Sequence, residues 1–176
     1  MKNKKVLIGV GCAVLLIFLI CAGVVGYFGY KAFIKESRNQ NIINYNNEMV
    51  DERNDVIASI DNVTDKLDNA VTIEEVQEAI DAAEEDVAAL RSIFESKDVP
   101  AGGQPVADAN KEYIDLSQQL VDKAQEAVDG ANNFEDVTVY IDEYNILIDD
   151  LNEKNTDIAR KLNEAVGREE IDLDTL

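Results

Sequence analysis

Histidine is absent from this chain of 176 residues, and only two cysteines occur, Cys12 and Cys21. The absence of histidine removes the commonest general base and the commonest neutral metal ligand. It also removes the Glu-x-x-His pattern by which helical bundles hold a di-iron site. Beyond Cys21 the chain has no thiol nucleophile, and disulfides therefore reveal nothing about its redox compartment.

No motif for nucleophilic catalysis or phosphate binding replaces these residues. Ser59, Ser92, Ser96 and Ser117 lack the Gly-x-Ser-x-Gly context of a hydrolase. Gly102-Gly103 is not followed by the Gly-Lys element of a phosphate-binding loop. Carboxylates occur in pairs at Glu74-Glu75, Glu84-Glu85, Asp149-Asp150 and Glu169-Glu170. Because buried Asp and Glu are rare, we expect these pairs on a solvated face. Since no other motif for catalysis is present, we predict that the protein is not an enzyme and has no catalytic, cofactor-binding or metal-binding residue.

Positive charge is scarce after the first 38 residues. Residues 1–38 hold six Lys or Arg and one Glu, whereas residues 39–176 hold ten Lys or Arg and thirty-five Asp or Glu. Residues 39–176 therefore have a net charge of −25, residues 1–38 have a net charge of +5, and the whole chain has −20. Such a domain repels phosphate backbones and anionic lipid, which argues against nucleic-acid binding and favours a domain that stands off the bilayer.

An uncharged apolar run extends from Val6 to Tyr30. As a helix its 25 residues measure roughly 37 Å, more than the ~30 Å hydrocarbon core of a bilayer. A cleaved signal has a shorter apolar region of about 7–15 residues. Lipidation at Cys21 or Cys12 is the other alternative, but bulky residues precede Cys21 and too few residues precede Cys12. We therefore expect an uncleaved transmembrane helix at 6–30.

The residues beside this run predict its orientation. Lys2, Lys4 and Lys5 precede it, and Lys31, Lys35 and Arg38 follow it with Glu36. The positive-inside bias is slight, but the short basic lead at the extreme amino terminus points the same way. We expect a cytoplasmic lead at 1–5 and an extracytoplasmic carboxyl-terminal domain.

The rest of the chain has the apolar period of helices. A juxtamembrane linker is expected at 31–41. The stretch NQNIINYNN, residues 39–47, has five Asn in nine residues and is interpreted as a hinge, or alternatively as a continuation of the membrane helix. A first helix is expected at about 42–70. Thr72 and Glu75 form a capping box, with Val71 and Val76 as a hydrophobic staple, for a second helix ending near Lys97.

Two further helices are expected after the sequence VPAGGQP. Pro105 suits the first turn of the third helix, and Gly130 is placed just past its end. Asn133, followed by Glu135 and Asp136, opens the fourth. Gly167 closes it, before an acidic tail at 168–176.

The predicted fold class is all-α: an amino-terminal transmembrane helix followed by an antiparallel up-down four-helix bundle at 42–167. The predicted core positions are Ile42, Met49, Val56, Ile60, Val63, Leu67 and Ala70, then Ile73, Val76, Ile80, Ala83, Val87, Leu90 and Phe94, then Tyr113, Leu116, Leu120, Ala124 and Ala127, and finally Val137, Ile141, Tyr144, Ile148, Leu151, Ile158 and Leu162. Pairing of the first and fourth helices between chains, as a coiled coil, is the alternative.

Two sets of polar side chains lie near these stripes. Asn145, Asn152 and Asn155 are interpreted as a buried polar layer that fixes helix register. Tyr113, Tyr140 and Tyr144 are expected at the edge of the core, with their hydroxyls reaching solvent.

The stretch YNNEMVDERNDVIASIDNVTDKL, residues 45–67, resembles the first helix of uncharacterised bacterial surface lipoproteins and membrane-anchored envelope proteins. The resemblance implies an all-helical extracytoplasmic domain and no activity or site. This chain departs from the lipoproteins because an uncleaved anchor stands in place of a good lipobox.

We therefore expect a single-pass, surface-exposed structural or protein-interaction module of the cell envelope. Its partners would be the membrane, through Val6 to Tyr30, and a protein or envelope polymer, with homo-oligomerisation left open. A ligand-binding sensor or transporter-accessory domain is the alternative.

Overall fold

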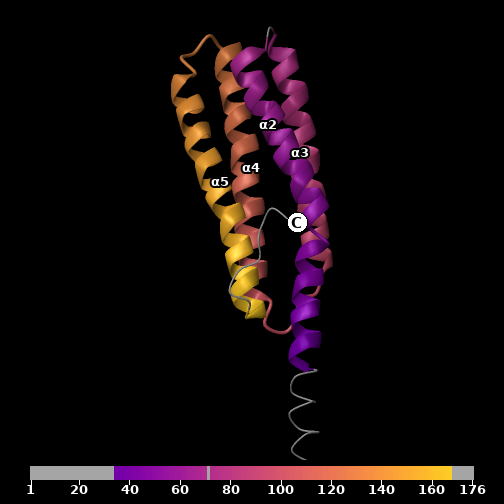
Figure 1. Ribbon diagram of the computed structural model, residues 1–176. Coiled ribbons are helices and arrows are strands. Elements are labelled where there is room, and N and C mark those ends of the chain that lie inside the picture. Colours follow the sequence, from indigo (N-terminus) through magenta and orange to yellow (C-terminus); the bar gives the residue numbers. More distant parts are fainter. Residues whose placement is uncertain (1–33, 71, 168–176) are drawn as a thin grey trace, which may run out of the picture. The chain divides into compact units, whose positions relative to one another are not determined.

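The computed structural model describes residues 34–70 and 72–167 (Figure 1). The chain divides into two units, residues 1–40 and 41–176, which are treated separately. Several predictions lie outside the described residues: the lead at 1–5, the apolar run at 6–30 with both cysteines, the staple residue Val71, the pair Glu169-Glu170 and the tail at 168–176. Among the described helices, none is long and apolar enough to cross a membrane.

The four labelled helices are α2 (Val50–Asn69), α3 (Ile73–Ser96), α4 (Gln104–Asn132) and α5 (Thr138–Val166). Residues 34–47 are also helical, so the described part of the Asn-rich segment is not an extended hinge. No strand occurs within 34–70 or 72–167. The all-helical fold class is thus confirmed for the described residues.

The first predicted helix, about 42–70, is interrupted. Residues 48 and 49 form a turn between helical residues 34–47 and α2. The Met49 amide donates to the Asn46 carbonyl at 3.0 Å, a tighter i to i−3 bond than the α-helical one. The apolar spacing continues across this turn, since Ile42, Met49 and Val56 are all fully buried. The period of apolar residues therefore could not predict the interruption of the helix.

The signals at the start of α3 and at both ends of the α3–α4 connection are confirmed. The Glu75 amide donates to the Thr72 hydroxyl at 3.3 Å, as expected for an N-cap. α3 ends at Ser96, one residue before the predicted Lys97. Pro105 lies in the first turn of α4, where a missing amide proton costs nothing.

The predicted boundary between α4 and α5 is wrong by several residues. Gly130 lies inside α4 rather than past its end. A Cβ there would come within 3.1 Å of the Tyr140 ring, so this glycine serves a close helix approach. Asn133 caps the carboxyl end of α4, and α5 starts only at Thr138, whose amide donates to the Asp136 carboxylate at 3.0 Å. At the other end of α5, Gly167 has φ 66° and closes the helix as predicted.

Contacts between helices show that consecutive helices run antiparallel. Between α3 and α4, Gln77 meets Gln125 at 2.8 Å and Arg91 meets Asp115 at 3.2 Å, so position numbers rise on one helix as they fall on the other. The same reversal appears for Glu48–Lys97 and Lys66–Glu75, and for Glu112–Lys154 and Lys123–Glu143. Figure 1 shows the resulting succession, in which α2, α3, α4 and α5 alternate in direction.

The apolar stripes of all four helices meet inside one chain. Val56, Ile80, Leu120 and Tyr144, one from each helix, belong to the same buried cluster. A second, smaller cluster joins Ile42, Val106, Leu162 and Val166. Most predicted core positions are buried, but Ile73 is 37% exposed. Four helices packed within one chain are therefore confirmed, and pairing between chains is not needed to bury the stripes.

We call the end of unit 41–176 that contains the second cluster the proximal end, because the polypeptide enters there at Asn41. The proximal end also holds the α3–α4 connection, residues 97–103. The distal end holds the α4–α5 connection, residues 133–137. α4 joins the two ends with 29 residues, or about 43 Å at ~1.5 Å per residue.

Candidate functional site

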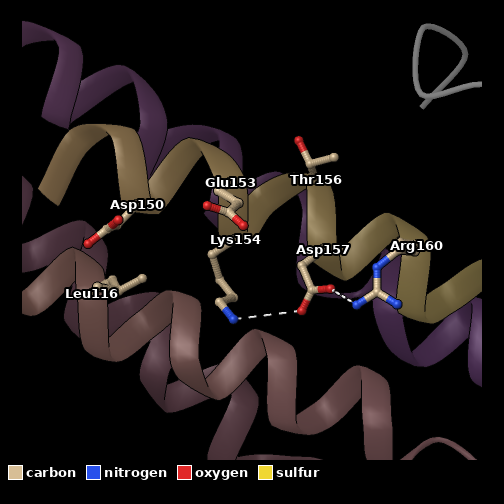
Figure 2. Close-up of a pocket in the computed structure, with 7 residues that line it drawn as sticks. All are labelled: Leu116, Asp150, Glu153, Lys154, Thr156, Asp157 and Arg160. Carbon is tan, nitrogen blue, oxygen red and sulfur yellow. Dashed lines mark hydrogen bonds and ion pairs between the residues drawn. The ribbon is translucent and has the colours of Figure 1, made fainter. Parts of the chain in front are cut away.

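A groove between α4 and α5 has a volume of about 520 Å³ (Figure 2). Its lining residues are Leu116, Asp150, Glu153, Lys154, Thr156, Asp157 and Arg160. Figure 2 shows that all of them except Leu116 come from α5, whose charged side chains follow one another along the helix. The groove is thus a surface depression with one apolar residue and both signs of charge.

Both cations that line this groove are paired with carboxylates. The Lys154 ammonium pairs with Glu112 and lies 3.7 Å from Asp157. The Arg160 guanidinium pairs with Asp157 and bonds Glu164 at 2.6 Å. The hydrogen bond to Glu112 raises the pKa of Lys154, so the amine stays protonated and cannot act as a base. Such half-exposed pairs contribute only about 0–1 kcal/mol each and indicate a solvated surface more than a reaction centre.

A buried polar cluster lies nearer the proximal end. Arg53 on α2 is 8% exposed, and its Nη1 donates to Oδ1 of Asn110 on α4 at 3.0 Å. Asn110, 2% exposed, donates in turn to the Val106 carbonyl at 2.9 Å. Within the described residues Arg53 makes no ion pair, and burial lowers its pKa. The apolar spacing of α2 gave no sign that a cation would be buried at this position.

The Tyr113 hydroxyl belongs to the same interior. Tyr113 is 1% exposed, so the expectation of a solvent-reaching hydroxyl is wrong. Burial raises its pKa to about 12, with a smaller opposing effect of the Arg53 charge. It lines a cavity of about 50 Å³ between α2, α4 and α5. That volume is far below the ~300 Å³ of ordinary ligand pockets, so the cavity does not fit a metabolite.

The predictions for the other tyrosines and for the asparagines of α5 had different outcomes. Tyr144 is 2% exposed, and its hydroxyl lies 3.0 Å from the Thr64 hydroxyl, so it too is internal. Tyr140 is half-buried. Asn145, Asn152 and Asn155 are exposed, so the expected buried Asn layer is wrong. The polar interior is formed by Arg53 and Asn110 instead, on other helices.

The carboxylate pairs lie at the surface, as expected. Glu74, Glu84, Glu85, Asp149 and Asp150 are exposed. Glu75 is half-exposed and lies 4.0 Å from the Lys66 ammonium. Within the described residues no group of acidic or thiol side chains has the arrangement of a metal site.

The distal end carries apolar side chains on its surface. Phe134, in the α4–α5 connection, is 97% exposed. Val139 and Ile146, on α5, are 61% and 62% exposed. The two lie seven residues apart and therefore share one face of the helix. We call these three residues the distal strip.

Phe134 also has an unusual backbone. Its φ is 60°, and within the described residues it is the only non-glycine residue with positive φ. The Phe134 amide donates to the Ala131 carbonyl at 3.1 Å, and the Glu135 amide donates to the Gly130 carbonyl at 2.9 Å. These two bonds form a Schellman motif, in which the left-handed position is usually glycine. Sequence reasoning missed this residue because a lone phenylalanine between Asn and Glu fits neither an apolar stripe nor a turn signal.

Comparison with known proteins adds no assignment. No family model, curated protein or solved structure matches this chain.

Proposed function

We propose that this protein is a single-pass membrane-anchored module of the cell envelope, and that its helical unit binds another envelope component. The observation that carries the proposal is the exposed apolar distal end. It lies about 43 Å, at ~1.5 Å per residue, from where the chain enters the unit, as measured along the 29 residues of α4. Three large apolar side chains that are each more than 60% exposed, Phe134, Val139 and Ile146, gather at this end, and such a gathering supports contact with a partner.

The membrane part of the proposal rests on the sequence. The run from Val6 to Tyr30 contains no charged residue and is long enough to span the hydrocarbon core. In the proposed arrangement residues 1–5 are cytoplasmic, 6–30 span the membrane, and 31–41 lead to an extracytoplasmic bundle at 42–167 with an acidic tail at 168–176. The charge of residues 39–176 supports a domain held away from anionic lipid.

A binding role is favoured over catalysis by the chemistry of the side chains. The chain has no histidine, and the lysine of the α4–α5 groove is held in its protonated form by Glu112. The only amine that lines the groove is therefore not available as a base or nucleophile, which supports binding over catalysis. The proposed role is thus to hold or organise a partner.

Protease accessibility tests the proposal. Protease added to intact cells or spheroplasts should digest the region 39–176, and the intact mass of the purified protein should include the original amino terminus. Digestion only after lysis would reverse the proposed orientation. A mass that begins near Gly23, or a lipid adduct on Cys12 or Cys21, would refute the uncleaved anchor.

The α4–α5 groove supports a second candidate, a ligand-binding sensor or transporter-accessory domain. Its volume of about 520 Å³ and its paired charges suit a small zwitterion better than an apolar ligand. Titration calorimetry with free amino acids tests this role. Saturable binding that is lost in Lys154→Met, and kept in the exposed control Lys111→Met, would favour the sensor over the interaction module.

A further inference from the structure

We infer that the distal strip docks a cationic segment of another protein, one in which apolar residues alternate with Lys or Arg. This inference rests on the proposed function and names the surface and the chemistry of the partner.

Phe134 combines an exposed ring with a backbone conformation that favours glycine. Its ring is 97% exposed, so it contributes almost no burial to folding. Its left-handed backbone, with φ 60°, disfavours any residue that carries a Cβ atom, which glycine lacks. A glycine would satisfy the same Schellman motif at lower cost. The phenyl ring is therefore best explained by a contact outside the chain.

The distal strip continues from Phe134 onto α5. Val139 and Ile146 lie on one exposed face of α5. Asp142 lies between them in sequence, three residues after Val139 and four before Ile146, and thus on the same side of the helix. Asp142 is exposed and, within the described residues, makes no ion pair. An apolar anchor and an available carboxylate thus alternate along the strip.

The charge around the strip selects the partner. Nine acidic residues and no basic residue occur between Lys123 and Lys154. Two members of that run pair with a cation, since the carboxylates of Glu126 and Glu143 lie 2.5 Å and 2.8 Å from the Lys123 ammonium. Glu135, beside Phe134, is exposed and makes no side-chain ion pair among the described residues. The field over the strip therefore attracts a positively charged partner.

The same charge disfavours the other occupants. A second copy would bring another −25 from its residues 39–176 against this surface, and like charges at an interface are unfavourable. An anionic bilayer is repelled for the same reason. A Lys- or Arg-rich segment with an apolar residue for the Phe134 contact satisfies both features of the strip.

Site-specific cross-linking in cells that produce the full-length protein tests the inference. A photoreactive phenylalanine derivative replaces Phe134, and in a matched control it replaces Val99, which is 40% exposed in the α3–α4 connection. We expect an adduct from position 134 but not from position 99. Mass spectrometry of the adduct should identify a Lys- or Arg-rich peptide of a different protein. An adduct with a second copy, with lipid or with an acidic or neutral segment, or no adduct at all, would overturn the inference.

Charge variants sharpen the result. In the cross-linkable protein, Glu135→Gln with Asp142→Asn should lower the adduct yield about 3- to 10-fold, because attraction to the cationic segment is weakened. Glu84→Gln with Glu85→Gln removes the same charge from exposed sites on α3 and should leave the yield unchanged. Equal losses from both pairs would mean that only the overall negative charge matters, which would refute a defined strip.

Fractionation of the same cells separates this inference from the proposed function. If the protein sediments with membranes but its adduct contains lipid, the anchored module stands and the docking inference fails. If the protein is in the soluble fraction and still cross-links to a basic segment, the docking inference stands and the membrane anchor fails.

Discussion

Each end of unit 41–176 has a connection with one left-handed residue, but the residue type differs between the two ends. In the proximal α3–α4 connection the residue with left-handed backbone is Gly102, with φ 84°. In the distal α4–α5 connection it is Phe134, with φ 60°. Glycine takes this conformation without a steric cost, whereas phenylalanine does not. The distal connection is thus expected to be less stable than one with glycine at position 134, and it exposes an aromatic ring.

The buried side chains near the two ends also differ. The proximal half buries the Arg53 guanidinium against Asn110, together with the Tyr113 hydroxyl. The distal half is filled by apolar side chains such as Leu120, Val121 and Ala124. The proximal half thus buries a cation, whereas the distal half, where the Tyr144 and Thr64 hydroxyls lie 3.0 Å apart, buries no charged side chain among the described residues and has apolar side chains on its surface. Local stability therefore depends on different interactions at the two ends, and the following changes separate them.

The largest effect is expected from Leu120→Ala in the apolar half. Leu120 is fully buried, so its truncation should lower the free energy of unfolding by about 2–5 kcal/mol. Chemical denaturation of residues 39–176, produced alone, measures the change, and Glu84→Gln is the surface control with almost no expected effect.

This measurement also tests the packing of four helices within one chain. The melting temperature of residues 39–176 should not depend on protein concentration. A melting temperature that rises with concentration would show that the helices associate between chains, because folding is then coupled to association.

The next effect concerns the polar half. Asn110→Ala leaves the Arg53 guanidinium buried without its hydrogen-bond acceptor, which should cost about 2–3 kcal/mol. Arg53→Met combined with Asn110→Leu removes both polar groups and should recover much of that loss. If the double variant is as unstable as the sum of Arg53→Met and Asn110→Leu measured singly, Arg53 and Asn110 do not depend on each other, and the described pair is not what stabilises this half.

The sequence predicted the starts of α3 and α4 well and the buried polar contacts poorly. Helices α3 and α4 were located by local signals whose physics is short-range, the Thr72 cap and Pro105 in the first turn. The burial of Arg53 depends on Asn110, 57 positions away, and no local pattern contains that information. Asn145, Asn152 and Asn155 had a plausible spacing but lie on the exposed side of α5.

The distal strip shows a second limit of sequence reasoning. Gly130 and Asn133 looked like the end of one helix and the start of the next, whereas both belong to the end of α4. What places α5 is the close approach of Tyr140 to Gly130, a tertiary contact. Without the correct boundary, Phe134 could not be recognised as a left-handed residue.

A smaller and pH-dependent effect is expected from Tyr113. Its pKa is raised by burial to about 12, from 10.0. The unfolded chain releases this proton first as pH rises, so the folded state binds more protons between pH 10 and about 12, and stability falls with pH in that window. The loss is roughly 1.4 kcal/mol per pH unit. At neutral pH no loss is expected.

Tyr113→Phe is the variant that isolates this effect. It should reduce the alkaline loss of stability, measured by urea denaturation at a series of pH values. Tyr140→Phe is the matched control, since Tyr140 is only half-buried. An identical alkaline loss in wild type and Tyr113→Phe would mean that the Tyr113 hydroxyl is not protected from ionisation by burial.

The smallest expected effect is the most direct test of the difference between the two ends. Phe134→Gly should stabilise residues 39–176 by about 1 kcal/mol, because glycine accepts the left-handed backbone and little burial is lost. Gly102→Ala should destabilise by a similar amount, about 1 kcal/mol, because alanine does not accept φ 84° readily. Thermal denaturation of both variants measures the two shifts, which should be opposite in sign. If Phe134→Gly instead destabilises the unit, the ring contributes to folding, and the argument that it is kept for a partner loses its basis. If Phe134→Gly is more stable and the full-length variant no longer co-purifies with the partner identified by the cross-link at position 134, stability has been lost at this position in favour of binding.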